Sequence, residues 1–352
     1  MAEEDIHLIL QWAKLRMLEK LQNLNIVGSV VVLSDFFLDR IIKIQSISAF
    51  YDLISKKSTM GGSIRGIHQK DLKGGNAVNV AFALARLGAP VSLITVADKS
   101  SSRILYDTFS MFPNSSLFIM EGKPGRTTAL EFTDNDQDVN IMLSDVGDNE
   151  NFGPERLGQK EKAVIRNADA VIVTNWASNE KGTELAKFTF EESKKSLHFL
   201  DPADIQSRRG EFKEAIGELA SNLDSLCLNE NECNILLKQF DFGSISNEEE
   251  TKKLISILSE KISVAIDLHT SFGSFWSNRK EVEFVKNFPV EIKFVTGAGD
   301  VWDAANILGY LANLEPRQRL LFANAAAALY VRNSEGMPPT MQEVLSLVTA
   351  AQ

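Results

Sequence analysis

The segment TGAGDVWDAANILGYLANL, residues 296–314, carries the strongest local signal in the chain. Gly297 and Gly299 stand between the apolar run EIKFV (291–295) and a helical pattern, so they predict a junction from strand to helix. Backbone N–H groups at such a junction converge at the start of the helix, where the helix dipole also favours an anion. Asp300 then has two interpretations: a helix-capping residue worth about 1 kcal/mol, or a base beside a bound phosphate.

A second glycine-rich turn, KGGNAVN at residues 73–79, runs into a helix that contains many small residues. Paired glycines let a ligand approach the backbone closely, and Asn79, one turn into the helix, can hydrogen-bond hydroxyl groups. Taken alone, the segment is more often a glycine turn before a helix that packs tightly on a sheet. Its occurrence together with GAGD favours the ligand-binding interpretation.

Strands alternate with helices along most of the chain. Continuous apolar runs of this length are typical of parallel strands that are buried on both faces. They occur at residues 26–34, 91–97, 170–174, 197–201 and 225–229. Helices are expected near 101–111, 180–194, 209–221, 230–237, 299–312, 316–331 and 340–350, and a hairpin at 273–278 and 281–286. The sequence therefore predicts an α/β fold with a central, mostly parallel sheet.

Two regions interrupt this alternation. Residues 38–73 and 116–143 contain short extended runs joined by turn-rich pieces, without helices between them. We expect them to form a small antiparallel sheet that projects from the main one. The chain is expected to be one domain over residues 26–352, preceded by a helical extension over residues 1–25. Apolar residues spaced by three or four positions predict an amphipathic helix at 3–23 that packs against the body.

Charge and targeting features argue against several classes of protein. The 352 residues include 37 Lys and Arg against 47 Asp and Glu, a formal net charge of -10, which argues against binding to nucleic acid or anionic membranes. The N-terminus is acidic where a secretory signal would be basic, so a cytoplasmic location without a membrane span is expected. Cys227 and Cys233 form no CxxC pair, which predicts reduced thiols rather than a zinc site.

Two common phosphate-binding motifs do not explain the GAGD segment. The sequence contains no GxxxxGK[ST] loop, and GAGDVW departs from GxGxxG because Trp302 occupies the last glycine position. A bound phosphate would therefore need a different fold from the P-loop and dinucleotide-binding folds.

The GAGD and KGGNAVN segments together resemble the two signature regions of the ribokinase-like, or PfkB-type, carbohydrate kinases. Further segments are similar to that family in order and spacing over about residues 26–345, namely SDFFLD (34–39), RTT (126–128), LDPAD (200–204), the NxxE pattern at 229–232, and GMP (336–338). The resemblance implies a three-layer ribokinase-like sandwich with a small β lid.

The resemblance also implies a role for each matching residue. Asp300 would be the catalytic base, and the N–H groups of Gly297, Ala298 and Gly299 would form an anion hole for the transferred phosphoryl group. Substrate contacts would come from Asp35, Asp39, Gly74, Gly75 and Asn79. Nucleotide contacts would come from Asn229, Thr270, Gly273 and Asn324, and a magnesium contact from Glu232.

Some positions depart from the family pattern. Phe294 and Val295 precede the GAGD loop where the family has Asp-Thr, and Ala305 replaces a usual glycine. The expected nucleotide loop is altered to Asp-Leu-His-Thr at 267–270, with Gly273 shifted by one position. The sequence therefore does not decide which nucleotide is used or whether a monovalent cation binds. It also leaves open whether His269 lies near the nucleotide.

The resemblance implies a cytoplasmic phosphotransferase that uses ATP and Mg²⁺ to phosphorylate a hydroxymethyl group of a sugar, sugar phosphate or nucleoside. The alternative is a non-catalytic sugar or nucleotide sensor on the same fold. A nucleoside acceptor would need Phe36 or Phe37 at the pocket, whereas a phosphosugar would need Arg40 or Arg126 there. Pairing of two subunits as a homodimer is left open.

Overall fold

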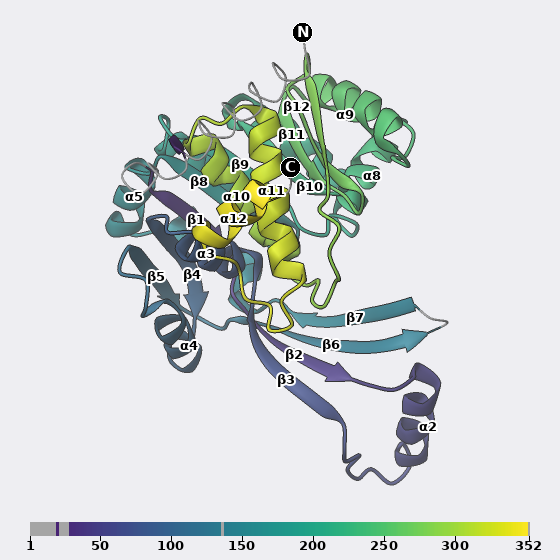
Figure 1. Cartoon of the computed structure of the whole chain (residues 1–352). Helices are drawn as coiled ribbons and strands as arrows, with labels where there is room; N and C mark the ends of the chain where they lie inside the picture. Colours follow the sequence, from purple (N-terminus) through teal and green to yellow (C-terminus); the bar gives the residue numbers. More distant parts are fainter. Residues whose placement is uncertain (1–18, 21–27, 135–136, 351–352) are drawn as a thin grey trace.

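The computed structural model describes residues 19–20, 28–134 and 137–350 (Figure 1). The amphipathic helix predicted over residues 3–23 lies almost entirely outside the described residues. Within it, Glu19 and Lys20 are helical, and Lys20 Nζ donates to the backbone oxygen of Asn313 at 2.6 Å.

A nine-stranded sheet runs through the centre of the molecule in the order β13-β12-β11-β10-β9-β8-β1-β4-β5 (Figure 1). The strands from β5 to β11 in this order are parallel, and β12 and β13 form an antiparallel hairpin at one edge. Their bounds are β1 Val30–Ser34, β4 Val91–Ala97, β5 Ser115–Glu121, β8 Ala170–Thr174, β9 Leu197–Asp201, β10 Ser225–Asn229, β11 Ala265–His269, β12 Gly273–Ser277 and β13 Val282–Lys286. The predicted mostly parallel sheet is confirmed.

Helices cover both faces of this sheet because its strands are apolar on both sides. In β1, Val30 and Val32 face one hydrophobic core, whereas Val31 and Leu33 face the other. The first core is covered by α3 Asn76–Arg86, α4 Lys99–Phe109, α10 Ala298–Leu311, α11 Pro316–Val331 and α12 Met341–Ala350. The second is covered by α5 Gln159–Arg166, α6 Gly182–Glu192, α7 Arg209–Leu219, α8 Glu230–Gln239 and α9 Glu248–Ile262.

A smaller four-stranded sheet, in the order β3-β2-β6-β7, projects from one end of the body (Figure 1). Its strands are β2 Phe37–Lys43, β3 His68–Gly74, β6 Gly125–Asp134 and β7 Gln137–Asp145. Neighbours are antiparallel except for β2 and β6, which are parallel. We call these four strands the small sheet.

Three local predictions were wrong. Residues 38–73 contain a helix, α2 Ile47–Lys57, which lies at the far end of the small sheet, where the Ser46 side chain caps it. The segment that begins at residue 116 supplies β5, which pairs with β4 in the main sheet rather than with the small one. Residues 291–295 form no strand, and the chain reaches GAGD through a loop after β13.

The strand order reverses next to β1, which creates a crevice at the carboxyl ends of the strands. The chain runs from β1 to β4 and β5 on one side, and then crosses to β8 and onward on the other. Ligands of open α/β sheets bind at such a switch point. The small sheet and the starts of α3 and α10 lie at this same edge.

Within the described residues, no helix is both long and apolar enough to cross a membrane.

Candidate active site

A cavity of about 590 Å³ opens at the carboxyl edge of the main sheet, beneath the small sheet. Residues from several parts of the fold line it: the small sheet, the start of α3, the loops after β8 and β9, the ends of β10 and β11, and the starts of α8 and α10. Of the predicted site residues, it brings together Asp39, Gly75, Asn79, Asn229, Glu232, Gly297, Ala298, Gly299 and Asp300.

The GAGD segment forms the start of α10, with Gly297 as its N-cap. Gly297 has a φ of +85°, and a Cβ there would lie 2.8 Å from Tyr330 Oη, so both backbone and packing require glycine. The N–H of Ala298 donates to Val295 O at 3.0 Å, which removes it from the predicted anion hole. First-turn N–H groups have no acceptor within their own helix, so the N–H groups of Gly299 and Asp300 are free of α10's own hydrogen bonds.

Asp300 is a buried carboxylate on the cavity wall, and it connects the two glycine-rich segments. Its Oδ2 accepts a hydrogen bond from Asn79 Nδ2 at 2.9 Å, although the two residues are 221 positions apart. Burial raises the pKa of Asp300 well above its usual range, and the nearby Asp201 adds to the shift. A carboxylate with a raised pKa is a stronger proton acceptor once it is ionised, as a general base requires.

Asp39 reaches the cavity from the small sheet. Burial raises its pKa to about 6, while a hydrogen bond from the Thr127 side chain opposes the shift. A Cβ on Gly74 would lie 1.8 Å from the Asp39 carboxylate, so Gly74 supports the site by leaving room for Asp39 although it does not itself line the cavity. Lys73, whose pKa burial lowers to about 8, interacts electrostatically with both Asp300 and Asp39.

Asp35 has a structural position rather than the predicted substrate contact. It is 1% exposed, and it is not among the described residues that line the cavity. Its two oxygens accept from the backbone N–H groups of Asn76 and Ala77 at 2.8 and 3.0 Å, from Thr174 Oγ1 at 2.8 Å and from Asn175 Nδ2 at 3.1 Å. Asp35 thus fixes the start of α3 against the end of β8.

Asp35→Ala is therefore expected to lower the free energy of unfolding by about 3 kcal/mol or more, because three buried donors and one partly buried donor lose their acceptor. Urea unfolding monitored by circular dichroism measures this effect. Asp71→Ala is the matched control, since Asp71 lies on the small sheet in an exposed ion pair with Arg40. Equal stability of the two variants would contradict the structural role.

Asn229 and Glu232 begin α8 and form a reciprocal capping box. The Asn229 side chain accepts from Glu232 N at 3.0 Å, and Glu232 Oε2 accepts from Asn229 N at 2.9 Å. Both residues line the cavity, and Glu232 is 5% exposed. Burial, with Asp201 nearby, raises the pKa of Glu232 well above its usual range. The NxxE pattern therefore has a local capping role as well as a position facing the cavity.

Three predicted nucleotide residues do not line the cavity in the described part of the chain. Thr270 and Gly273 close the turn between β11 and β12, where Thr270 Oγ1 donates to Gly273 O at 2.7 Å. Asn324 is buried inside the first core, where it accepts from Trp302 Nε1 at 2.8 Å and donates to Val285 O at 3.0 Å. His269, beside Thr270, does line the cavity, and burial lowers its pKa to about 4, so it is neutral at pH 7.

Three carboxylates at the cavity, Asp201, Asp204 and Asp303, are additional to the predicted site residues. Asp201, at the end of β9, accepts from Asn76 Nδ2 at 3.1 Å, and the LDPAD pattern already marked its position. Asp303, one turn after Asp300 on α10, is 2% exposed, and its Oδ1 has no hydrogen-bond partner among the described residues. Because Asp303 is three positions after Asp300, both side chains lie on one face of α10. This spacing in the sequence could have identified Asp303 as a further site residue.

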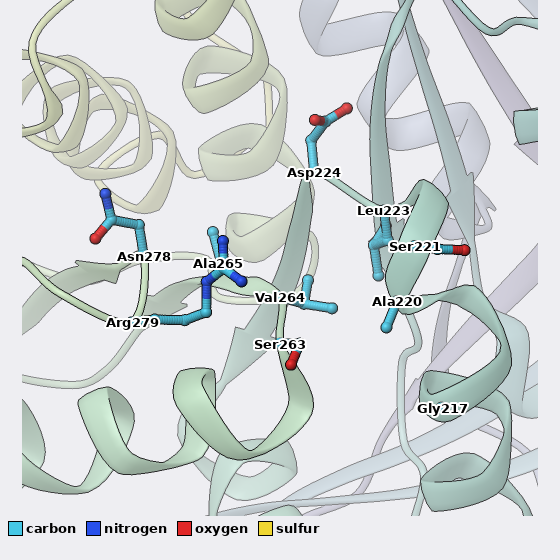
Figure 2. A pocket seen from close by; sticks show the side chains of 10 residues that line it. All are labelled: Gly217, Ala220, Ser221, Leu223, Asp224, Ser263, Val264, Ala265, Asn278 and Arg279. Carbon is cyan, nitrogen blue, oxygen red and sulfur yellow. The ribbon is translucent and has the colours of Figure 1, made fainter.

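A second hollow lies at the opposite, amino-terminal ends of β10 and β11 (Figure 2). Its lining consists mainly of small side chains and the exposed Arg279, and it contains none of the predicted site residues from the described part of the chain. The chemistry suggested by the sequence is therefore confined to the carboxyl edge of the sheet.

Comparisons with known proteins bear on the family and the fold of the chain. The sequence model of the pfkB family carbohydrate kinases matches residues 39–342. The chain is 24% identical over 295 residues to the ribokinase of Haemophilus influenzae, covering 83% of this chain and 92% of that one. It is 27% identical over 290 residues to an ATP-dependent ribose-1-phosphate kinase of Halopiger xanaduensis, covering 80% and 88%.

The fold is also similar to a solved structure of Arabidopsis thaliana ribokinase complexed with ribose and ATP. The TM-score is 0.72 at 18% identity, with 92% of this chain and 99% of that chain covered. Together with the family match over most of the sequence, this similarity confirms the ribokinase-like fold. The chain belongs to the pfkB family of carbohydrate kinases.

Proposed function

We propose that this protein transfers the γ-phosphoryl group of ATP to a hydroxymethyl group of a sugar, sugar phosphate or nucleoside, with Asp300 as the general base. The observation that carries the proposal is the 2.9 Å hydrogen bond from Asn79 Nδ2 to Asp300 Oδ2. It joins the starts of α3 and α10, each of which follows a glycine, within one cavity. A buried base beside a helix N-terminus is the arrangement that phosphoryl transfer to a hydroxyl requires.

Each wall of the cavity has a part in the proposed reaction. Asp39, Thr127 and the Asn79 amide form hydrogen bonds with the hydroxyl groups of the substrate. These bonds orient the reacting hydroxyl group toward Asp300. The ionised Asp300 takes the hydroxyl proton as the oxygen attacks phosphorus, and ADP leaves. The N–H groups at the start of α10 stabilise the charge on the transferred group. The small sheet acts as a lid that limits the access of water.

The acidic residues of the cavity fit a magnesium ion that accompanies the nucleotide. Asp201, Glu232 and Asp303 are buried oxygen donors, and the unpartnered Oδ1 of Asp303 is an atom that a cation would satisfy. No group of three or more metal-ligating side chains is preassembled in the described part of the chain. This agrees with the usual way in which Mg²⁺ binds, through one or two carboxylates with water and substrate phosphates. When bound, Mg²⁺ would neutralise phosphate charge.

Glu232→Gln is accordingly expected to raise the Mg²⁺ concentration that gives half-maximal activity by about tenfold. The amide keeps one oxygen for the capping hydrogen bonds but loses the charge that attracts the cation. Titration of the initial rate with MgCl₂ at a fixed ATP concentration measures the effect. Glu230→Gln is the control on the same helical turn, because Glu230 is bonded to Ser271 and does not line the cavity. An unchanged Mg²⁺ dependence in Glu232→Gln would contradict the assignment.

The proposed function is tested by a coupled assay of ADP formation over sugars, phosphosugars and nucleosides, in which at least one acceptor should give turnover well above the ATPase background. A sensor on the same fold would instead show thermal stabilisation by ligands with no acceptor-dependent ADP formation. A cytoplasmic location, where ATP and Mg²⁺ are both available, is part of the proposal.

A further inference from the structure

The cavity-facing side of the small sheet is arranged in two rows of side chains. One row crosses the strands as Leu72, Asp39, Thr127 and Ser144, which are successive register partners. Thr127 Oγ1 and Ser144 Oγ lie 3.1 Å apart, so three neighbouring strands present oxygen atoms in a line. We call Asp39, Thr127 and Ser144 the polar row, and Leu72 flanks it on β3.

A second row, two residues farther from the body on each strand, is apolar. Ile41, Ala129 and Met142 are again register partners, and all three line the cavity. We call them the apolar row. Because side chains on one face of a strand repeat every two residues, the rows are about 7 Å apart. Met142 is 56% exposed, so this end of the cavity has apolar surface that nothing in the described chain covers.

Carboxylic side chains dominate the lining of the cavity, and Lys73, which interacts electrostatically with Asp39 and Asp300, is not itself a lining residue. Six carboxylic side chains line the cavity, and among its described lining residues none is Lys or Arg. Arg40 is paired with Asp71, and it and Arg126 lie at strand positions that alternate with the cavity-facing Asp39 and Thr127, on the other face of the small sheet. Lys70 is in register with Ile41, but its ammonium lies 3.8 Å from Glu335.

These features make an anionic acceptor unfavourable. A phosphate or carboxylate on the acceptor would enter a partly buried site lined by six carboxylic side chains and by no guanidinium group, and the charge of Lys73 is already shared by Asp39 and Asp300. The nucleotide does not face this difficulty, because its phosphates bring Mg²⁺ and meet the N-terminus of α10. The Arg residues at 40 and 126 that a phosphosugar would need are not at the cavity.

We propose that the acceptor is an uncharged nucleoside, whose ribose hydroxyls bind the polar row and whose base lies against the apolar row. The inference rests on the proposed kinase function. The ribose hydroxymethyl group must face Asp300, so the substituent at C1 points away from it, along the small sheet. Phe37 also lines the cavity, but it lies on the body side of the polar row, four residues from Ile41 on β2, and so takes no part in the proposed base contact.

The test compares acceptors that differ in the substituent at C1: nucleosides with each of the four common bases, D-ribose and ribose 1-phosphate. We expect kcat/KM for the best nucleoside to exceed that for ribose by at least about tenfold and that for ribose 1-phosphate by at least about 100-fold. A higher kcat/KM for ribose 1-phosphate or for ribose than for every nucleoside would overturn the inference and leave the kinase function standing. Absence of turnover with all acceptors, together with no nucleoside binding in calorimetry, would overturn both.

Met142→Ala tests the place of the base. This change should raise KM for nucleosides about tenfold, while KM for ribose changes by less than twofold. The matched control is Leu143→Ala, since Leu143 is the next residue on β7, is 58% exposed and points to the other face of the small sheet. An equal rise in KM for ribose and nucleosides, or an equal effect of the two substitutions, would overturn the proposed contact.

Discussion

Asp300→Asn is expected to lower kcat by about 10³- to 10⁴-fold, because the amide cannot take the proton of the acceptor hydroxyl. Asparagine keeps the shape of the side chain, and its Oδ1 can still accept from Asn79 Nδ2, which now bonds Asp300 at 2.9 Å. The dissociation constants for ATP and acceptor should therefore change little. Steady-state kinetics together with calorimetric titration separates the two effects. A kcat within tenfold of the wild type would mean that Asp300 is not the base.

The stability of this variant gives a second readout with a defined sign. The pKa of Asp300 is raised in the folded chain, chiefly by burial, so the folded state binds the proton more tightly than the unfolded state. The carboxyl consequently favours folding at low pH, and that contribution is lost as the pH rises through the folded pKa. A neutral asparagine removes this cost, and its Tm at pH 8 should be equal to or above that of the wild type. A Tm several degrees lower would show that lost activity reflects unfolding.

Gly297→Ala is the second substitution with a large expected effect, a fall in kcat of about 10²- to 10³-fold. Its φ of +85° disfavours any residue with a Cβ, and that atom would lie 2.8 Å from Tyr330 Oη. Relief of the strain must rotate the backbone at the start of α10, which moves the N–H groups that we assign to the anion hole. Steady-state kinetics of Gly297→Ala with varied ATP give both kcat and the ATP concentration at half-maximal rate. We expect the larger change in kcat.

Gly66→Ala is the matched control for this substitution. Gly66 has a φ of +82°, almost the same as Gly297, but a Cβ there would meet no atom within 4 Å. It lies between α2 and β3, outside the described lining of the cavity. Gly66→Ala should thus have a similar backbone cost in stability and wild-type kcat. Equal kinetic effects of the two substitutions would exclude a specific role for the Gly297 backbone.

Much of the main sheet could be predicted from sequence because its strands are buried on both faces. The runs at 91–97, 170–174, 197–201 and 225–229 coincide with β4, β8, β9 and β10. The small sheet was harder to predict, since its edge strands are partly exposed and polar. The helix α2 has no buried residue, so no apolar stripe directed at a core marked its place, and its apolar residues were interpreted as extended chain.

The site was predicted best where glycine and a helix start coincide. Gly297, Asp300, Gly75 and Asn79 meet in one cavity because α3 and α10 both begin at the carboxyl edge of the main sheet, although α3 follows a strand of the small sheet and α10 follows the loop after β13. Asp35 follows the end of β1, but four hydrogen bonds of 2.8–3.1 Å from its neighbours hold its carboxylate away from the cavity, and only the three-dimensional contacts show this. Asn324 likewise bonds Trp302 inside the core. Residue type and spacing alone do not distinguish a buried polar anchor from a ligand contact.

Transfer of labelled phosphate is the most direct measurement of what this protein does. Purified protein is incubated with ATP labelled at the γ-phosphate, MgCl₂ and each acceptor, and the products are separated and identified by mass spectrometry. We predict that label moves to the hydroxymethyl oxygen of an uncharged acceptor, that the transfer needs Mg²⁺, and that Asp300→Asn abolishes it. Ligand binding with no labelled acceptor, or labelled product formed equally by Asp300→Asn, would contradict the proposed kinase.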